Sequence, residues 1–501
     1  MKSNYYVSSL FWSTLSRILN AVLGFITVPL LLGYYGKAEY GLFSIATACN
    51  SYMHLLDLGM NTGAVKFYSQ WKAEGKIDKV FRVARSNITF YIIISVINIL
   101  MLLAVAFFGE NLFSVTHDQF LQIRACLCII ALFSMISWVT TVFNQLLIAD
   151  KQMTFTMQVQ CVQTILKAVL VFCVFYAHLE LTIYFFFLTA LVAVAFFPYA
   201  YKCKKDNLID SFKPAWYWGD FKVVIMFSLS IFALSLFQVT ATQSRPIILS
   251  MFAQNGATSV ADFRILEVVP SLIIMIGGTF SGIFLPKTAE MVARKDETAM
   301  QKFAYKWTKY TTVVVAFMCF PFMLCAKETL SAYVGNEYAN LSPWLIIWCV
   351  TVLIQMHTTP GNALVLAHGK TKLLVQVTAC GCVASMILNI ILCKYFNVGS
   401  AIIAYFIYVC FIIGLYYVSF YKKLLNLSRR KMLVCFLIPT IVAALVYIVV
   451  SCIPIDKSIF GDINERIGYV LVCVSKTMMW AIPYIAILYF GKIVDFKQIK
   501  K

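Results

Sequence analysis

Eight ionisable residues lie within stretches of the sequence that are otherwise apolar. At bilayer depth, an ionisable side chain costs about 3 kcal/mol unless it faces water or a partner. Each of these residues therefore marks either a polar function or an internal pair. Cations outnumber acids among them, which favours a water-filled cationic cavity that binds an anionic substrate. The five cations and three other titratable residues are Arg17, Lys167, Arg245, Arg264, Lys476, Asp57, Glu267 and His357.

Structural roles compete with substrate binding for several of these residues. Arg264 and Glu267 are spaced i, i+3 and can pair with each other on one helix. Asp57 precedes Leu58-Gly59, so it can serve to end a helix. Asp57 and Glu267 could instead take part in coupling transport to an ion, and both interpretations stay open.

The remaining candidates differ in how far they lie from the ends of their apolar stretches and in the alternative roles open to them. Arg245 can extend its side chain outward to the membrane surface, and Lys167 and Lys476 can be packing contacts between helices. His357, just before a Thr-Thr-Pro segment, can line the same cavity or be a buried, hydrogen-bonded histidine. Arg17 lies roughly 14 Å into its apolar stretch by helical rise, too deep for easy escape to water.

The sequence lacks the motifs of an enzyme. It contains no glycine-rich phosphate loop, metal-ligand cluster or activated nucleophile, so we expect no cofactor, no bound metal and no ATP hydrolysis. The 16 cysteines include no Cys-x-x-Cys pair and sit mostly within apolar stretches. This distribution indicates that the cysteines serve as small apolar side chains packed between helices.

Fourteen apolar stretches would position these residues, since a membrane-spanning helix needs roughly 20 apolar residues. The predicted spans are 8–33, 40–62, 86–108, 122–148, 153–177, 181–201, 221–249, 260–285, 309–326, 343–366, 373–393, 399–420, 432–453 and 467–490. With the N-terminus in the cytoplasm, the inward gaps and tails hold about 30 Lys and Arg and the outward gaps about 6. This asymmetry predicts that both termini are cytoplasmic.

Composition agrees with an all-α integral membrane protein, because 61% of the 501 residues are hydrophobic and 13% are charged. The net charge of +19 does not indicate nucleic-acid binding. The excess lies in short cytoplasmic loops, where membrane topology accounts for it and where anionic lipid headgroups are the expected contacts. The outward gaps are too short to hold a folded catalytic domain.

An internal repeat predicts two bundles in the same orientation. Val28-Pro29 and Tyr40 recur about 220 residues later as Arg245-Pro246 and Val260, and amphipathic elbows at 63–85 and 287–308 follow them. We therefore expect six-helix bundles at 1–215 and 216–425, followed by two helices and a cytoplasmic tail at 426–501. Hinges are predicted where proline removes a helical hydrogen bond, at Pro29, Pro246 and Pro270.

The first two spans and the eighth also resemble a known family. The segments that carry the likeness are Val28-Pro29-Leu30-Leu31-Leu32-Gly33-Tyr34-Tyr35-Gly36, Glu39-Tyr40-Gly41-Leu42-Phe43-Ser44, Leu55-Leu56-Asp57-Leu58-Gly59-Met60, and Phe263-Arg264-Ile265-Leu266 with Pro270. They are similar to the Wzx-type polysaccharide and O-antigen flippases of the multidrug/oligosaccharidyl-lipid/polysaccharide exporter superfamily, which also includes the multidrug MATE transporters.

The resemblance implies a function as well as a fold. Family members have two six-helix bundles around a central cavity and move undecaprenyl-diphosphate-linked oligosaccharides from the cytoplasmic to the periplasmic leaflet of the bacterial inner membrane. It implies that basic residues line the cavity, for which Arg17, Arg245 and Arg264 are the best matches by helix. The implied partners are the lipid-linked oligosaccharide, membrane lipids and other proteins of polysaccharide or lipopolysaccharide assembly.

Three other functions compete with this expectation. A drug/cation antiporter of the same fold would need an acidic cavity, whereas cations dominate here. A flippase for lipid-linked peptidoglycan precursors would share the topology. A membrane-embedded polysaccharide polymerase or ligase would need a large outward loop, which the sequence lacks.

Overall fold

The computed structural model describes residues 2–368, 372–460, 464–491 and 493. Within these residues the protein is 88% helical and contains no strand, so the expected all-α class is confirmed. The predicted cytoplasmic tail beyond residue 493 lies outside the described residues.

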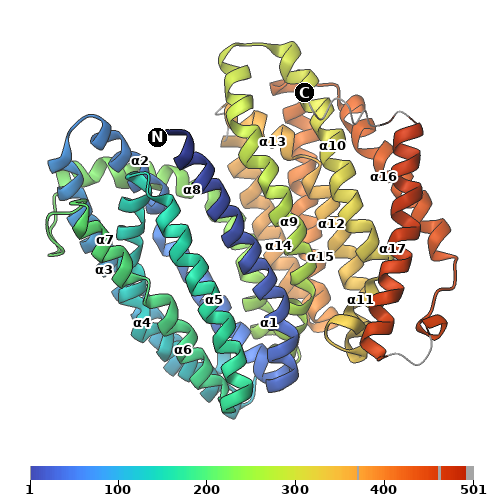
Figure 1. Cartoon of the computed structure of the whole chain (residues 1–501), viewed down its shortest axis with the longest axis horizontal. Helices are drawn as coiled ribbons and strands as arrows, with labels where there is room; N and C mark the ends of the chain where they lie inside the picture. The colour runs from blue at the N-terminus through green and yellow to red at the C-terminus, as the bar shows by residue number, and fades with distance from the viewer. Residues whose placement is uncertain (1, 369–371, 461–463, 492, 494–501) are drawn as a thin grey trace. The chain divides into compact units, whose positions relative to one another are not determined.

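The chain forms two compact units, Met1–Ala261 and Asp262–Lys501 (Figure 1). In the first, α3 packs along α4 and α1 packs along α5. Its elements are α1 (Lys2–Met53), η1 (His54–Asp57), α2 (Met60–Ala73), α3 (Ile77–Phe108), η2 (Glu110–Leu112), α4 (His117–Ala149), α5 (Met153–Ala177), α6 (Leu181–Ala193), α7 (Phe196–Lys205) and α8 (Trp218–Phe252). The division into units assigns α8 to the first of them, and the proposed bundle limits of 1–215, 216–425 and 426–501 stay a prediction.

The second unit contains most of α9 and all later elements. Its closest helix pairs are α14 with α15 and α10 with α16. The elements are α9 (Gly256–Ala293), α10 (Glu297–Leu324), α11 (Ala326–Tyr333), η3 (Asn336–Leu341), α12 (Ser342–Met356), α13 (Thr359–Ala367), α14 (Lys372–Phe396), α15 (Val398–Leu415), the π-helix η4 (Tyr416–Leu424), α16 (Arg429–Ser451), η5 (Lys457–Phe460) and α17 (Glu465–Phe490).

Eleven helical segments in the described part of the chain are long and apolar enough to cross a membrane. One of them, Phe11–Asp57, overlaps two predicted spans, 8–33 and 40–62. The helices α8 and α9, with 35 and 38 residues, are also longer than a bilayer requires. Counting α1 as two segments and adding α8 and α9 to the eleven gives 14 helical segments. They lie at the positions of the 14 predicted spans.

The breaks between and within these segments do not fall at the proposed proline hinges. α1 runs helically through Pro29 and breaks at Gly36, which has φ 82° and ψ 170°, a conformation open essentially only to glycine. α8 likewise continues through Pro246. A second break separates α12 from α13 at His357 and Thr358, because Pro360 has no N–H to donate to the carbonyl oxygen four residues earlier.

The two predicted elbows differ in the structure. The first contains a separate helix, α2, because Leu58 and Gly59 both adopt left-handed conformations and end the preceding segment. The second is no separate helix: α9 continues to Ala293, and α10 starts at Glu297 after a short turn. No tandem left-handed residues precede it, so the spanning helix simply extends.

Glycines allow two close helix contacts within the first unit: the second half of α1 packs against the start of α9, and α2 packs against α8. A Cβ added at Gly41 would overlap the carbonyl oxygen of Ala257 at the start of α9. A Cβ at Gly59 would lie 2.7 Å from the carbonyl oxygen of Ser228 in α8. Gly63 meets the same serine, so the four-residue spacing of these two glycines brings α2 against α8.

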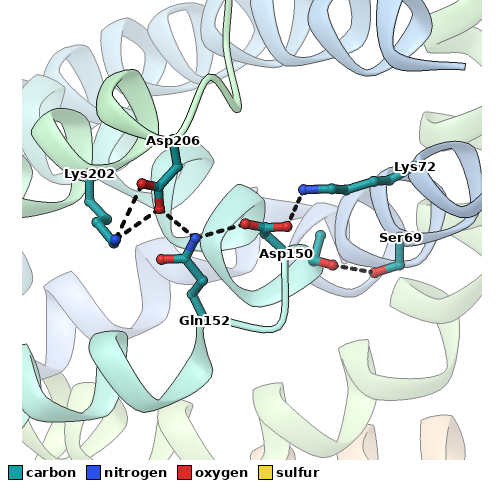
Figure 2. Close-up of polar contacts among 7 residues, drawn as sticks. Ser69, Lys72, Asp150, Gln152, Lys202 and Asp206 are labelled. Carbon is teal, nitrogen blue, oxygen red and sulfur yellow. Dashed lines mark hydrogen bonds and ion pairs between the residues drawn. The ribbon is translucent and has the colours of Figure 1, made fainter. Parts of the chain in front are cut away.

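A cluster of alternating charges joins the ends of four helices in the first unit, α2, α4, α5 and α7 (Figure 2). The Gln152 Nε2 atom donates to Asp150 Oδ2 at 2.7 Å and to Asp206 Oδ2 at 2.6 Å. Lys72 of α2 pairs with Asp150, and Lys202 of α7 pairs with Asp206 at 2.9 Å. These contacts lower the pKa of Asp206, chiefly through the Gln152 hydrogen bond. The amide of Gln152 thus separates two carboxylates that would otherwise repel each other.

Gln152→Glu is expected to destabilise the protein by about 2 kcal/mol at neutral pH, because it replaces a shared donor by a third carboxylate. The two neighbouring carboxylates should raise the pKa of the carboxyl introduced at position 152 by like-charge repulsion. Once protonated, this carboxyl can again donate a hydrogen bond, so the loss of stability should shrink as the pH falls toward about 5. Thermal unfolding of the purified protein across this pH range measures the effect against wild type. An equal deficit at both pH values would contradict the proposed bridge.

Candidate functional site

A cavity of about 310 Å³ lies inside the N-terminal unit. Four elements line it: the second half of α1 with η1, α4, α5 and α6. Its lining contains both polar and apolar side chains. The lining residues are Thr47, Asn50, His54, Ile130, Ser134, Ser137, Trp138, Thr141, Lys167, Phe185, Leu188, Thr189 and Val192.

Lys167 is the one Lys, Arg, Asp or Glu among the described residues that line this cavity. It lies in α5, about 21 Å from the start of that helix and about 15 Å from its end by helical rise, so it sits at mid-membrane depth. No carboxylate in the described part of the chain pairs with it. An ammonium group at this depth requires polar surroundings, and the cavity supplies them.

Helical spacing explains why the polar lining gathers on one side. Thr47, Asn50 and His54 follow one another at i, i+3 and i+7 along α1 and η1. Positions three and four apart share one face of a helix, so the three side chains point the same way. The same spacing recurs in α4 at Ser134, Ser137 and Thr141. This repeated spacing is the signal in the sequence that could have found the hydroxyl residues, which were not among the predicted site residues.

A buried hydrogen-bond network supports the cavity wall next to Trp138. Tyr91 stacks on Trp138 with ring centroids 5.8 Å apart, and its hydroxyl donates to Asp57 Oδ1 at 2.5 Å. Gln145 Nε2 donates to the same Tyr91 oxygen at 2.9 Å, and Asn87 Nδ2 donates to Gln145 Oε1 at 2.7 Å. Asp57 therefore holds a residue of the wall through Tyr91.

Three of the other predicted cations have different surroundings. Arg17 is exposed on the first half of α1. Arg245 is 5% exposed in α8, where its Nε donates to the carbonyl oxygen of Thr242 at 3.2 Å. Arg264 pairs with Glu267 at 2.6 Å, the i, i+3 contact that their spacing predicted. None of the three lines the cavity of the N-terminal unit.

The remaining predicted residues lie in the second unit. Lys476 of α17 pairs with Glu328 of α11 at 2.5 Å, with both side chains less than 20% exposed. His357 is 2% exposed, bonds Tyr417 through Nε2 at 3.1 Å, and packs on the Phe436 ring. Pro270 lies buried within α9. The structure thus brings Lys167 alone, of the predicted cations, to the cavity.

Breaking the Lys476–Glu328 pair is expected to destabilise the protein. Lys476→Met or Glu328→Gln alone should cost about 3 kcal/mol, since each leaves one buried group without its partner, and the double variant should cost less than either. Thermal unfolding in detergent measures this. The exposed pair Arg294–Glu290 is the matched control, for which removal of one partner should change little. If the double variant instead lost as much stability as the two single variants together, Lys476 and Glu328 would not interact.

The arrangement of these helices is similar to that of solved membrane transporters. The fold matches the lipid II flippase MurJ in its inward closed conformation, with a TM-score of 0.68 and 15% identity over 97% of this chain and 100% of that one. It also matches an inward-facing multidrug resistance MATE transporter of the MOP superfamily, with a TM-score of 0.67 and 14% identity over 83% of this chain and 93% of that one.

A third similar structure is a MOP superfamily transporter from Pyrococcus furiosus described by the reverse polarity of its binding pocket. Its TM-score is 0.54 at 13% identity, over 87% of this chain and 93% of that one. No curated protein matches this sequence. The chain belongs to the polysaccharide biosynthesis protein family, whose model matches residues 6–284.

Proposed function

We propose that the protein is a flippase that moves an undecaprenyl-diphosphate-linked oligosaccharide from the cytoplasmic to the periplasmic leaflet of a bacterial inner membrane, for surface polysaccharide synthesis. Membership of the polysaccharide biosynthesis family supports this proposal. The observation that carries it is the cavity around mid-span in α5, in which Lys167 lies among hydroxyl groups and has no carboxylate partner among the described residues. A fold shared with transporters and a flippase, rather than with enzymes, agrees with it.

The chemistry of such a substrate suits this cavity. A diphosphate carries the negative charge that a lysine at bilayer depth needs, and the saccharide carries hydroxyl groups that pair with Ser, Thr and Asn. The lipid tail can stay in the bilayer while the polar headgroup crosses. Alternation between inward-open and outward-open states, with basic residues such as Arg17, Arg245 and Arg264 along the path, completes the proposal.

A drug/cation antiporter is the second candidate, because one structure with this fold is a multidrug resistance transporter. An organic cation would be attracted by carboxylates. The described lining of the N-terminal cavity contains a lysine and no carboxylate, which favours an anionic substrate.

Proteoliposomes containing the purified protein and a fluorescent undecaprenyl-diphosphate oligosaccharide test the function. We expect the fraction of label open to a membrane-impermeant quencher to change with time when the protein is present, and to stay constant in protein-free liposomes. A fluorescent organic cation in the same vesicles tests the antiporter. Transport of the cation without movement of the lipid-linked saccharide would overturn the flippase proposal.

The proposed direction requires a defined topology, which cysteine labelling in intact cells tests. On a background without native cysteines, Asp118→Cys is expected to react with an impermeant maleimide, whereas Lys204→Cys should react only after lysis. Both positions are exposed, so accessibility depends on the side of the membrane. Labelling of position 204 from outside intact cells would reverse the orientation.

A further inference from the structure

The cavity of the N-terminal unit has the size of a small-ligand site. Its volume of about 310 Å³ lies at the lower end of the range for such sites, about 300 to 1,000 Å³. That volume suits one or two sugar rings rather than a long oligosaccharide.

One wall of this cavity is an aromatic surface held in place. Trp138 is 5% exposed, and its indole is stacked against Tyr91 at an angle of 26° between the rings. The His54 ring lies 5.3 Å from the Trp138 ring and also lines the cavity. Aromatic faces are electron-rich, so they attract the weakly positive C–H groups on the apolar side of a sugar ring.

Polar side chains with free bonding capacity line the same space. Ser134 is 4% exposed, and its Oγ atom is buried without a hydrogen-bond partner. The side chains of Asn50, Ser137 and Thr141 also make no hydrogen bond to another described residue. A buried hydroxyl left unbonded costs about 1 to 3 kcal/mol, so such groups indicate that a polar ligand or water occupies the site.

Lys167 adds a single positive charge to this aromatic and hydroxyl surface. A neutral sugar would leave that charge without compensation, whereas an anion attached to the sugar would pair with it. The charge, the aromatic wall and the hydroxyls together therefore select a saccharide that carries an anionic group.

We infer that this cavity binds the sugar-phosphate end of the transported molecule, with Trp138 against the ring of the first sugar, the side chains of α1 and α4 on its hydroxyls, and Lys167 on the phosphate. This inference rests on the proposed function and makes the cavity a determinant of sugar specificity. The sugars farther from the lipid need not enter it.

Binding can be followed with 5-fluorotryptophan incorporated into the full-length protein in lipid nanodiscs. The chain has 9 tryptophans, and Trp138→Phe assigns the cavity resonance in the ¹⁹F spectrum. We expect N-acetylglucosamine 1-phosphate to shift this resonance, and N-acetylglucosamine or inorganic phosphate to shift it at concentrations at least about tenfold higher. Glucuronic acid, a sugar with a carboxylate instead of a phosphate, tests whether the site requires a phosphate. We expect it to bind more weakly than N-acetylglucosamine 1-phosphate.

Variants separate the two parts of the site. Lys167→Gln should weaken binding of the sugar phosphate at least about tenfold, while Lys222→Gln, an exposed lysine of α8, should leave it unchanged. Ser137→Ala with Thr141→Val should weaken binding of the sugar phosphate and leave that of inorganic phosphate unaltered. A folded Lys167→Arg variant should retain part of the affinity, which separates a charge effect from misfolding.

Equal shifts with inorganic phosphate and with the sugar phosphate would reduce the cavity to an anion site and overturn the inference. Tight binding of the neutral sugar that is unaffected by Lys167→Gln would overturn the role of the lysine. A silent Trp138 resonance in protein that flips lipid-linked saccharide in proteoliposomes would overturn the inference and leave the proposed function standing. A shifted resonance in protein that flips nothing would support the site and remove the flippase function.

Discussion

Lys167→Gln is expected to lower the rate of lipid-linked saccharide flipping in proteoliposomes by about 10-fold to 100-fold. A hydrogen bond to a charged group contributes about 1.5 to 3 kcal/mol, and each 1.4 kcal/mol corresponds to a factor of ten. The effect should lie at the upper end because Lys167 is half-buried at mid-span in α5, where an ammonium group and an anion interact more strongly than in bulk water. Lys167→Arg should retain part of the activity, since it keeps the charge but changes its geometry.

The control for this experiment is Lys222→Gln, which removes an exposed charge from the same unit and should flip at the wild-type rate. Protein abundance in the vesicles and a thermal unfolding curve for each variant separate lost function from lost fold. A stable Lys167→Gln protein that flips normally would remove this residue from the transport path.

Gly41→Leu is expected to destabilise the protein by about 3 kcal/mol or to force the second half of α1 away from the start of α9. At this position even a single Cβ would overlap the Ala257 carbonyl oxygen, and main-chain atoms cannot move aside as the end of a flexible side chain can. Gly41→Ala should cause a smaller effect of the same sign. Thermal unfolding in detergent and the flipping rate in proteoliposomes together measure the outcome.

Gly33→Ala is the matched control, since it lies in the same helix and a Cβ there would meet nothing within 4 Å. Alanine also favours a helix over glycine by about 1 kcal/mol, so this control should be neutral or slightly stabilising. If Gly41→Leu were as stable and as active as Gly33→Ala, close approach of α1 to α9 would not be required for folding or for transport.

Hydropathy predicted the helical spans well because crossing a bilayer demands a long apolar helix. The stretch predicted at 86–108 lies within α3, and that at 122–148 lies within α4. Breaks were harder to predict. Gly33 and Gly36 lie three residues apart, and only the second adopts a non-helical conformation, since a glycine permits a break without requiring one.

The site could be predicted only in part, for a similar reason. A mid-span lysine is conspicuous in an apolar sequence, so Lys167 was among the eight candidates, although depth favoured Arg17. Ser134 and Thr47 were not among them, because isolated hydroxyl residues are common in membrane helices and become a site only when helices pack. Glu328 and Lys476 are 148 residues apart, and their contact depends on tertiary packing that no local pattern contains. By contrast, Arg264 and Glu267 share one helical turn, so their pairing could be predicted.

The ion pairs of the N-terminal unit affect the positive-inside signal differently during synthesis and after folding. Lys72 pairs with Asp150, 78 residues later, and Arg82 pairs with Asp220, 138 residues later. When either cation leaves the ribosome, its acidic partner has not yet been made, so the nascent chain presents an uncompensated positive loop to the insertion machinery. Folding then neutralises part of that charge. The mature surface should therefore attract anionic lipid less strongly than its 41 Lys and Arg residues alone would imply, although the same residues orient the protein as it is inserted.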